Sequence, residues 1–236
     1  VLFRSGGVAK CLRMQGKCLY YIKRYDEAWM LMNQALDIAI QIDNKKQIVA
    51  CHKQLYYLCR EFKRMMNERG DEQASTLFFR ESLLHEMYFS EKPRLAELTV
   101  RYEALRCDIM QQYYMNKDYD NVIRIATSLD IHDDADPNAS CLVYYYKAQA
   151  YVKLENYPMA KEAFFREFEL RKKYLGWEEE DTILACQNLG VLYSFCNERE
   201  EALACFREAY GHEVKKNGED SEMAQKLLQY ISVVES

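Results

Sequence analysis

The sequence predicts an all-helical chain built from repeated pairs of helices. Its 236 residues are 49% hydrophobic but include only 8 Gly and 3 Pro, too few for the many turns of a sandwich, barrel or parallel sheet. Four positions also recur forty-two residues later in the chain: Ala148, Tyr151, Ala160 and Phe164 correspond to Gly190, Tyr193, Ala202 and Phe206. Such repetition is typical of a solenoid, in which each helical unit packs on its neighbours.

The first part of the chain carries the same pattern in the segment GKCLYYIKRYDEAWMLMNQAL. Its small and large apolar positions are Gly16, Leu19, Tyr25, Ala28, Met32 and Ala35. These segments resemble the tetratricopeptide repeat, in which small and large residues of a first helix face a small residue and an aromatic of a second. The small residues let the two backbones approach, and the large ones fill the remaining space. The resemblance implies a right-handed α-α superhelix of about five helix pairs.

The five pairs follow from equivalent small positions in the second helix of each pair, which we assign to Ala28, Ala74, Val122, Ala160 and Ala202. We expect the pairs at about residues 9–43, 45–90, 94–132, 139–176 and 181–216, and a capping helix at 219–234. Together they form one domain over residues 6–236. Asp26, Asp71, Asp118 and Asn156 precede the second helices and are expected to cap them. Pro158 suits the first turn of a helix, and Pro137 is expected to break a connecting loop.

The first five residues, VLFRS, are interpreted as read-through of a sequencing adapter, because GTG CTC TTC CGA TCT translates to these letters. This interpretation makes the chain a fragment whose upstream part is missing. The run at residues 81–103 is similar to a segment common in bacterial regulators that carry these repeats beside a kinase, cyclase or DNA-binding module. We therefore expect part of a larger bacterial regulatory protein.

Charge is unevenly distributed along the chain. The net charge is −5, yet residues 1–66 carry 12 Lys and Arg against 5 Asp and Glu, whereas residues 67–236 carry 20 against 32. The asymmetry suggests that one end of the chain receives a charged partner, and the alternative is an uneven surface that is simply solvated. The 9 Cys form no C-x-x-C pair, and Cys11 and Cys18 lie seven residues apart on one helical face, so we interpret them as reduced core thiols. With no segment of about 20 apolar residues, a cytoplasmic location is expected.

A catalytic or metal centre is not predicted. The four histidines, His52, His85, His132 and His212, are assigned to different repeat units and to partly exposed positions. The acidic segment IHDDADPNAS around His132 lacks the glycine and the final glutamate of a calcium loop, and no glycine-rich phosphate loop occurs. The sequence therefore predicts a protein that is not an enzyme and that holds no metal or cofactor.

The predicted binding surface is the concave face, which the resemblance assigns mainly to the first helix of each pair. The basic N-terminal part comprises Lys10, Arg13, Lys17, Tyr20, Lys53, Tyr56, Tyr57, Arg60 and Lys63. A neutral continuation comprises Gln111, Tyr114, Tyr145, Gln149, Gln187 and Asn188. Lys and Arg pair with carboxylates and Tyr adds apolar area with a hydroxyl, so the expected partner is a protein or an acidic peptide.

The resulting prediction is a scaffold or sensing module that binds a peptide in a concave groove. One alternative is an RNA-binding helical-repeat protein, since tyrosines can stack on bases, although the acidic overall charge opposes phosphate binding. Another alternative is the non-catalytic fragment of an enzyme whose catalytic domain lies upstream.

Overall fold

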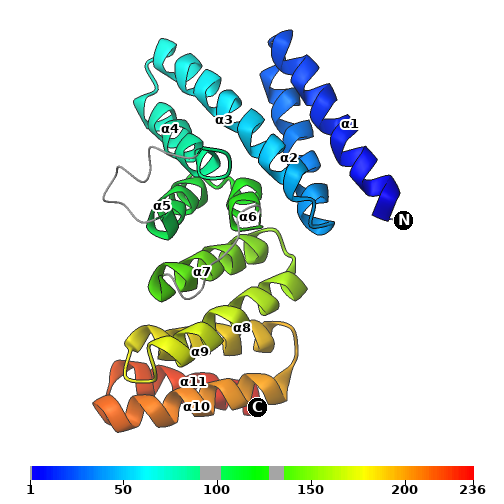
Figure 1. Ribbon diagram of the computed structural model, residues 1–236. Helices are drawn as coiled ribbons and strands as arrows, with labels where there is room; N and C mark the ends of the chain where they lie inside the picture. The colour runs from blue at the N-terminus through cyan, green and yellow to red at the C-terminus, as the bar shows by residue number, and fades with distance from the viewer. Residues whose placement is uncertain (1, 91–101, 128–135) are drawn as a thin grey trace. The chain divides into compact units, whose positions relative to one another are not determined.

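The computed structural model describes residues 2–90, 102–127 and 136–236, and within these ranges it contains only helices and no strand (Figure 1). The helices are α1 (Leu2–Tyr21), α2 (Tyr25–Gln41), α3 (Lys45–Glu68), α4 (Glu72–Glu86), α5 (Tyr102–Met115), α6 (Tyr119–Thr127), α7 (Pro137–Lys153), α8 (Tyr157–Tyr174), α9 (Glu180–Phe195), α10 (Arg199–Asn217) and α11 (Glu222–Glu235). The predicted all-helical class is confirmed for these residues. None of the described helices combines the length and the apolar character needed to cross a membrane.

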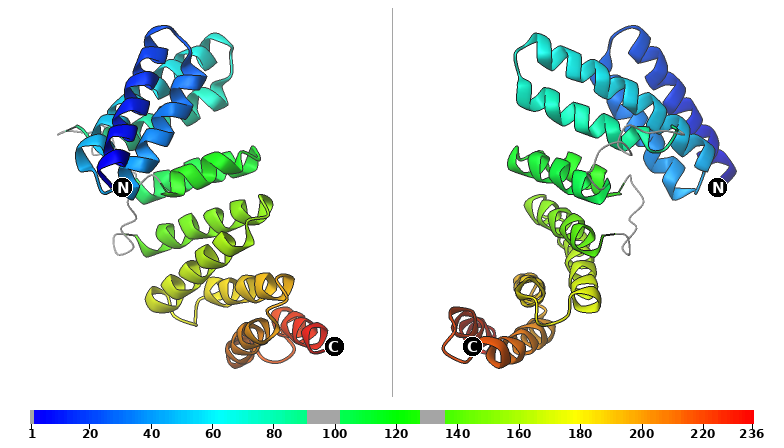
Figure 2. Two further views of the ribbon diagram at one scale, coloured as in Figure 1. Left: turned by 90° about the vertical axis from the view of Figure 1, so that its right-hand side faces the viewer. Right: turned by 60° about the vertical axis from the view of Figure 1, so that its left-hand side comes forward.

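Helices that are consecutive in the sequence pack as neighbours. The closest pairs are α1 with α2, α3 with α4, α7 with α8 and α9 with α10, and α11 packs against α10 (Figure 2). This arrangement confirms the predicted pairing of adjacent helices for α1 to α4 and for α7 to α10, whereas the pair expected at about 94–132 lies partly outside the described residues and stays a prediction. The contacts divide the chain into a first unit, with residues 2–90, 102–112 and Thr127, and a second unit, with Tyr113–Ala126 and residues 136–236. The single domain expected over residues 6–236 stays a prediction.

Six connections in the described part of the chain share one turn of three residues. The middle residue of each has a positive φ: Lys23, Asp43, Gly70, Lys117, Glu155 and Asn197 have values between 48° and 75°. The N–H of the third residue then donates to the carbonyl five positions earlier, as from Asn156 to Tyr151 at 2.9 Å. This left-handed turn provides hydrogen-bond donors for the last carbonyls of one helix, and the next helix begins directly after it.

The helices that follow these turns begin mostly as the sequence predicts. Asp71, Asp118 and Asn156 each accept a hydrogen bond from the backbone N–H three residues later, at 3.0, 3.3 and 3.4 Å. The expectation for Asp26 is wrong, because α2 begins at Tyr25, so that Asp26 lies inside the helix and Arg24 occupies the capping position without a side-chain hydrogen bond.

Two further positions differ from the sequence expectation. Pro137 does not interrupt a loop but is the first residue of α7, where proline fits because its missing N–H would have had no helical partner. Pro158 lies in the first turn of α8, as expected. In α4 the residue equivalent to Ala28 is Ser75 and not Ala74. Ser75 is 4% exposed, and its backbone N–H donates to the carbonyl of the capping residue Asp71.

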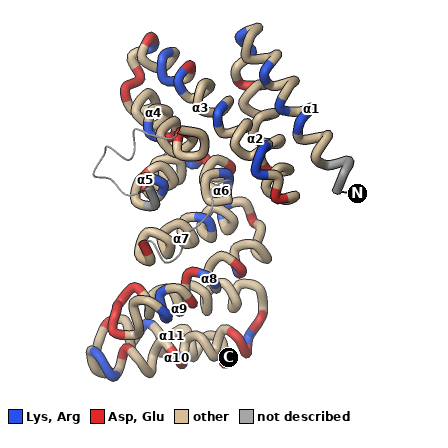
Figure 3. Tube along the Cα trace, viewed as in Figure 1, with Lys and Arg blue, Asp and Glu red and all other residues tan. Residues whose placement is uncertain are grey.

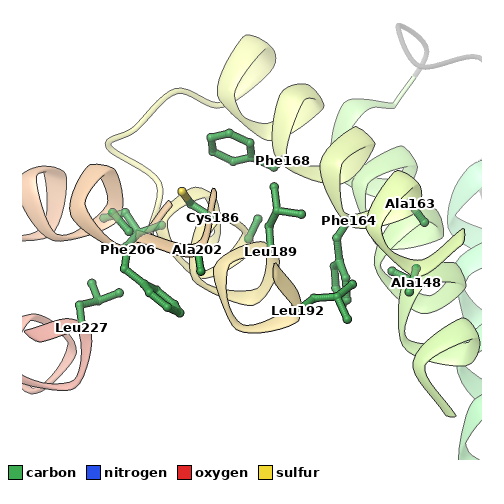
Figure 4. Packing of buried hydrophobic residues seen from close by; sticks show 14 of the residues in the cluster. Ala148, Ala163, Phe164, Phe168, Cys186, Leu189, Leu192, Ala202, Phe206 and Leu227 are labelled. Carbon is green, nitrogen blue, oxygen red and sulfur yellow. The ribbon is translucent and has the colours of Figure 1, made fainter. Parts of the chain in front are cut away.

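Each unit has an apolar core at its helix contacts. In the first unit the buried side chains are Ala28, Met32, Ala35, Leu36, Cys51, Leu55, Leu58 and Phe62. The second unit has a larger cluster, and Figure 4 shows side chains of it from α7, α8, α9, α10 and α11. Cys11 and Cys18 are exposed, so their assignment to the core is wrong, while Cys51 is buried and burial raises the pKa of its thiol to about 12.

Small residues in the first helix of a pair allow the close approach that the repeat pattern predicts. A Cβ added at Gly190 of α9 would lie 2.8 Å from Cε1 of Phe206 on α10, and one at Gly16 of α1 would lie 3.1 Å from Cγ of Met32 on α2. Because Phe206 is 1% exposed, its ring has no free space into which it can move.

We therefore expect Gly190→Ala to lower the free energy of unfolding by about 1–3 kcal/mol through overpacking. The matched control is Gly211→Ala in α10, where no atom lies within 4 Å of the added Cβ. That change is expected to stabilise the helix by about 0.5–1 kcal/mol, because alanine loses less backbone entropy than glycine. Urea unfolding followed by circular dichroism measures both, and equal effects of the two substitutions would contradict the packing argument.

Candidate functional site

A hollow of about 270 Å³ opens in the first unit between α1 and α3. It is lined by Arg13, Lys17, Tyr20 and Tyr21 of α1, Met32 of α2, and Ala50, Lys53, Gln54 and Tyr57 of α3. We call this the α1–α3 hollow. It brings together five of the nine residues predicted for the basic part of the binding face, and its wall is mostly apolar.

Helix geometry explains why these residues share one surface. Arg13, Lys17 and Tyr20 are four and three residues apart, and Lys53 and Tyr57 are four apart, so each set lies on one helical face. Figure 3 shows Lys and Arg along both α1 and α3. The two faces therefore supply a paired basic and aromatic lining.

The three cations of the α1–α3 hollow have neutral neighbours. Nε of Arg13 donates to Oε1 of Gln47 at 3.0 Å, and Nζ of Lys17 lies 5.8 Å from the ring centre of Tyr21. Nζ of Lys53 lies 5.9 Å from the ring of Phe89. Within the described ranges none of the three lies at ion-pairing distance from a carboxylate, so their charges are available to an acidic ligand.

Tyr20 lines the hollow and also packs against two other tyrosine rings. Its ring lies 5.7 Å from Tyr21 and 5.6 Å from Tyr25 between centres. Burial raises the pKa of the Tyr20 hydroxyl, and the carboxylate of Glu61 raises it further, so the hydroxyl keeps its proton as a hydrogen-bond donor. Glu61 is itself paired with Arg64, with 3.0 Å between its Oε2 and Nη2 of the arginine.

The remaining predicted residues of the first unit lie outside the hollow. Lys10 is exposed on α1, and Lys63 is placed 4.5 Å from the ring of Phe79. Tyr56 is only 8% exposed, and its hydroxyl accepts a hydrogen bond from Nη1 of Arg60 at 3.3 Å. Gln111 is exposed on α5.

In the second unit the predicted residues line two hollows. One of about 250 Å³ includes Gln149 and Asn188 among apolar side chains. The other, of about 370 Å³, includes Tyr145, Gln187 and Asn188 together with Glu167, Arg171, Asp181 and Lys226. Tyr114 instead packs on the rings of Tyr119 and Tyr146.

The larger of these hollows contains a buried ion pair that the sequence analysis missed. Nε of Arg171 lies 2.9 Å from Oε1 of Glu167, four residues earlier on α8, and its Nη1 lies 3.0 Å from Oδ2 of Asp181 on α9. Burial raises the pKa of Glu167 from 4.5 to about 7, against the opposing effect of Arg171. The available signal was the spacing of four between a Glu and an Arg on an apolar helix face.

Two of the four histidines, His52 and His85, do not occupy the positions expected of them. His52 and His85 lie on the paired helices α3 and α4, both fully buried, with their Nδ1 atoms 2.9 Å apart. The assignment of these two residues to separate units and partly exposed positions is wrong, because the α3–α4 pairing brings them together. His212 stacks on Trp177, with 4.0 Å between ring centres. His132 and most of its acidic segment lie outside the described residues.

Comparison with known proteins leaves the family open. No protein-family model matches the sequence, and a search of curated proteins found no significant match. Among solved structures, the chain is similar to the crystal structure of BtubC (BKLC) from P. vanneervenii, with a TM-score of 0.53 and 14% sequence identity. The match covers 99% of this chain and 83% of that one. At this identity the likeness concerns the fold alone.

The raised pKa of Glu167 predicts that the second unit loses stability as pH rises. The folded state binds the Glu167 proton more tightly than the unfolded state, so the contribution is complete below pH 4.5 and is lost as pH rises through about 7. Asp181 continues to pair with Arg171 while Glu167 is protonated. The difference between 4.5 and about 7 corresponds to a contribution of roughly 3 kcal/mol at low pH.

We expect Glu167→Gln to remove this part of the pH dependence. The measurement is the urea midpoint of both proteins, followed by circular dichroism between about pH 5 and about pH 8. The slopes of midpoint against pH are then compared. The control is Glu169→Gln, which changes an exposed carboxylate of the same helix and should keep the original slope. Parallel curves for the original chain and Glu167→Gln would show that Glu167 has the same pKa folded and unfolded.

Proposed function

We propose that this chain is a helical-repeat interaction module, and that the α1–α3 hollow binds an acidic peptide segment of another protein. The observation that carries the proposal is the set Arg13, Lys17 and Lys53, which face an open hollow without a carboxylate partner among the described residues. A partner that supplies carboxylates would form charge-assisted hydrogen bonds there.

The lining of the hollow also suits an apolar anchor in the peptide. Tyr20 and Tyr57 offer ring area and a hydroxyl, and Met32 and Ala50 form part of the wall. A peptide side chain buried among these groups would provide binding energy, while the cations would fix its register and accelerate its arrival. We therefore expect a ligand that combines two or more carboxylates with one central apolar residue.

The repeat architecture belongs to the same proposal. The six related turns and the close contacts at Gly16 and Gly190 support helix pairs of the tetratricopeptide type. We propose that successive pairs continue as a right-handed α-α superhelix, and that the module serves a larger regulatory protein as its scaffold or sensor. Peptide capture, rather than catalysis, is the activity that this architecture supports.

The binding proposal can be tested with labelled decapeptides of Asp and Glu that carry one central Phe, Leu or Tyr. Fluorescence anisotropy should show saturable binding that weakens between about 0.1 M and about 1 M salt, where the screening length falls from about 10 Å to about 3 Å. The double substitution Lys17→Glu with Lys53→Glu should weaken binding at least about tenfold, equivalent to about 1.4 kcal/mol.

The matched control is the double substitution Lys45→Glu with Lys46→Glu. Both lysines are exposed at the start of α3 and do not line the hollow. This control makes the same change in net charge and should leave the affinity within about twofold. An equal loss of peptide affinity in both double variants would mean that overall charge, and not the hollow, determines binding. Preference for single-stranded RNA over every acidic peptide would favour the RNA-binding alternative.

A further inference from the structure

A group of side chains suited to metal binding is buried between α3 and α4, away from the lining of the α1–α3 hollow. His52 and Cys59 come from α3, and Glu81 and His85 come from α4. All four are fully buried. Ionisable groups are placed in a protein interior at a high desolvation cost unless they are paired or bind a metal ion.

The distances within this group are close to those of a coordination site. One ligand atom from each of Cys59, Glu81 and His85 can be chosen so that all three lie within 4.8 Å of one another. Nε2 of His85 is 3.5 Å from Oε1 of Glu81. A tetrahedral zinc ion with bonds of about 2.0–2.3 Å separates its ligand atoms by roughly 3.4–3.7 Å, so only a small closure of the group is required.

We propose that Cys59, Glu81 and His85 bind one Zn²⁺ ion that ties α3 to α4. Thiolate, imidazole and carboxylate are the ligand types that zinc accepts, and soft sulfur disfavours Mg²⁺ and Ca²⁺. On binding, the Cys59 thiol releases its proton and the sulfur donates an electron pair to the metal. These three residues fill three of the four positions of a tetrahedral ion.

His52 has a different part in this arrangement. Its Nδ1 lies 2.9 Å from Nδ1 of His85, which leaves the Nε2 edge of His85 directed toward Glu81. A hydrogen bond at the second nitrogen of a metal-binding histidine fixes its tautomer and ring orientation. His52 is itself held by stacking on Tyr88, with 3.7 Å between ring centres. We assign His52 as a positioning residue for His85.

The local sequence explains how two helices provide this set. Glu81 and His85 are four residues apart, so both project from one face of α4. His52 and Cys59 are seven residues apart, two helical turns, and share the face of α3 that packs against α4. A metal held by both helices would therefore link the two members of one rigid pair.

The test uses the 236-residue chain, freed of metal by a chelator and then titrated with Zn²⁺ and, separately, with Co²⁺. We expect one equivalent of either ion to bind per chain, a higher melting temperature with Zn²⁺, and a sulfur-to-cobalt charge-transfer band in the near ultraviolet. Cys59→Ser should lose the charge-transfer band and weaken Zn²⁺ binding by at least a hundredfold. His52→Gln should weaken Zn²⁺ about 10–100-fold and keep the cobalt band.

Cys51→Ser is the matched control, because Cys51 is a fully buried thiol of the same helix but lies outside the group. This variant should keep one equivalent of metal and the cobalt band, even if its melting temperature falls. Circular dichroism confirms that each variant is folded before titration.

The proposal is overturned if the folded chain binds neither ion saturably at one equivalent, or if Cys51→Ser and Cys59→Ser lose binding equally. Either result would identify the group as a metal-free hydrogen-bonded cluster. Peptide binding in the α1–α3 hollow is measured separately, so failure of one proposal leaves the other intact.

Discussion

Close approach of the two helices in each pair is the constraint on which the rest of the structure depends. A turn of three residues with a positive φ in the middle brings the second helix beside the first immediately after the first one ends. The two backbones can then meet only where a side chain is small or absent. Gly190 against Phe206 shows this directly, since even one methyl group would overlap the ring. The helix faces turned away from such contacts remain free of this packing constraint.

This constraint explains which parts of the fold could be predicted from the sequence. The alternation of small and large residues reports helix contacts, so the all-helical class and the packing of adjacent helices in pairs followed from it. The errors in helix capping and in equivalent positions arose where one residue decides the register. Ala74 resembles the other small positions, yet Gly70 and the Asp71 cap place Ser75 there instead. A composition pattern cannot resolve a shift of one residue when neighbouring side chains are similar in size.

The residues of the proposed binding surface were predictable only where one helix determines them. Arg13 and Lys17 follow from the spacing on α1, and Lys53 follows from that on α3. The buried pairs His52 with His85 and Glu167 with Arg171 were missed for different reasons. The histidines belong to two helices, and helical periodicity fixes the face of a residue but not the residue opposite it. Glu167 and Arg171 share one helix, but their spacing does not reveal that both are buried.

Helix α3 connects the two proposed sites through its geometry. His52 and Cys59 face α4, whereas Lys53 and Tyr57 face the α1–α3 hollow, and adjacent residues of an α-helix are rotated by about 100°. The backbone that positions Lys53 in the proposed peptide-binding hollow is therefore the same backbone that carries the proposed zinc ligand Cys59. An ion that fixed α3 against α4 would limit rocking of α3 and so hold Lys53 and Tyr57 in place relative to α1. Ordering this face before a peptide arrives lowers the entropy lost on binding, which favours affinity without any direct contact between metal and peptide.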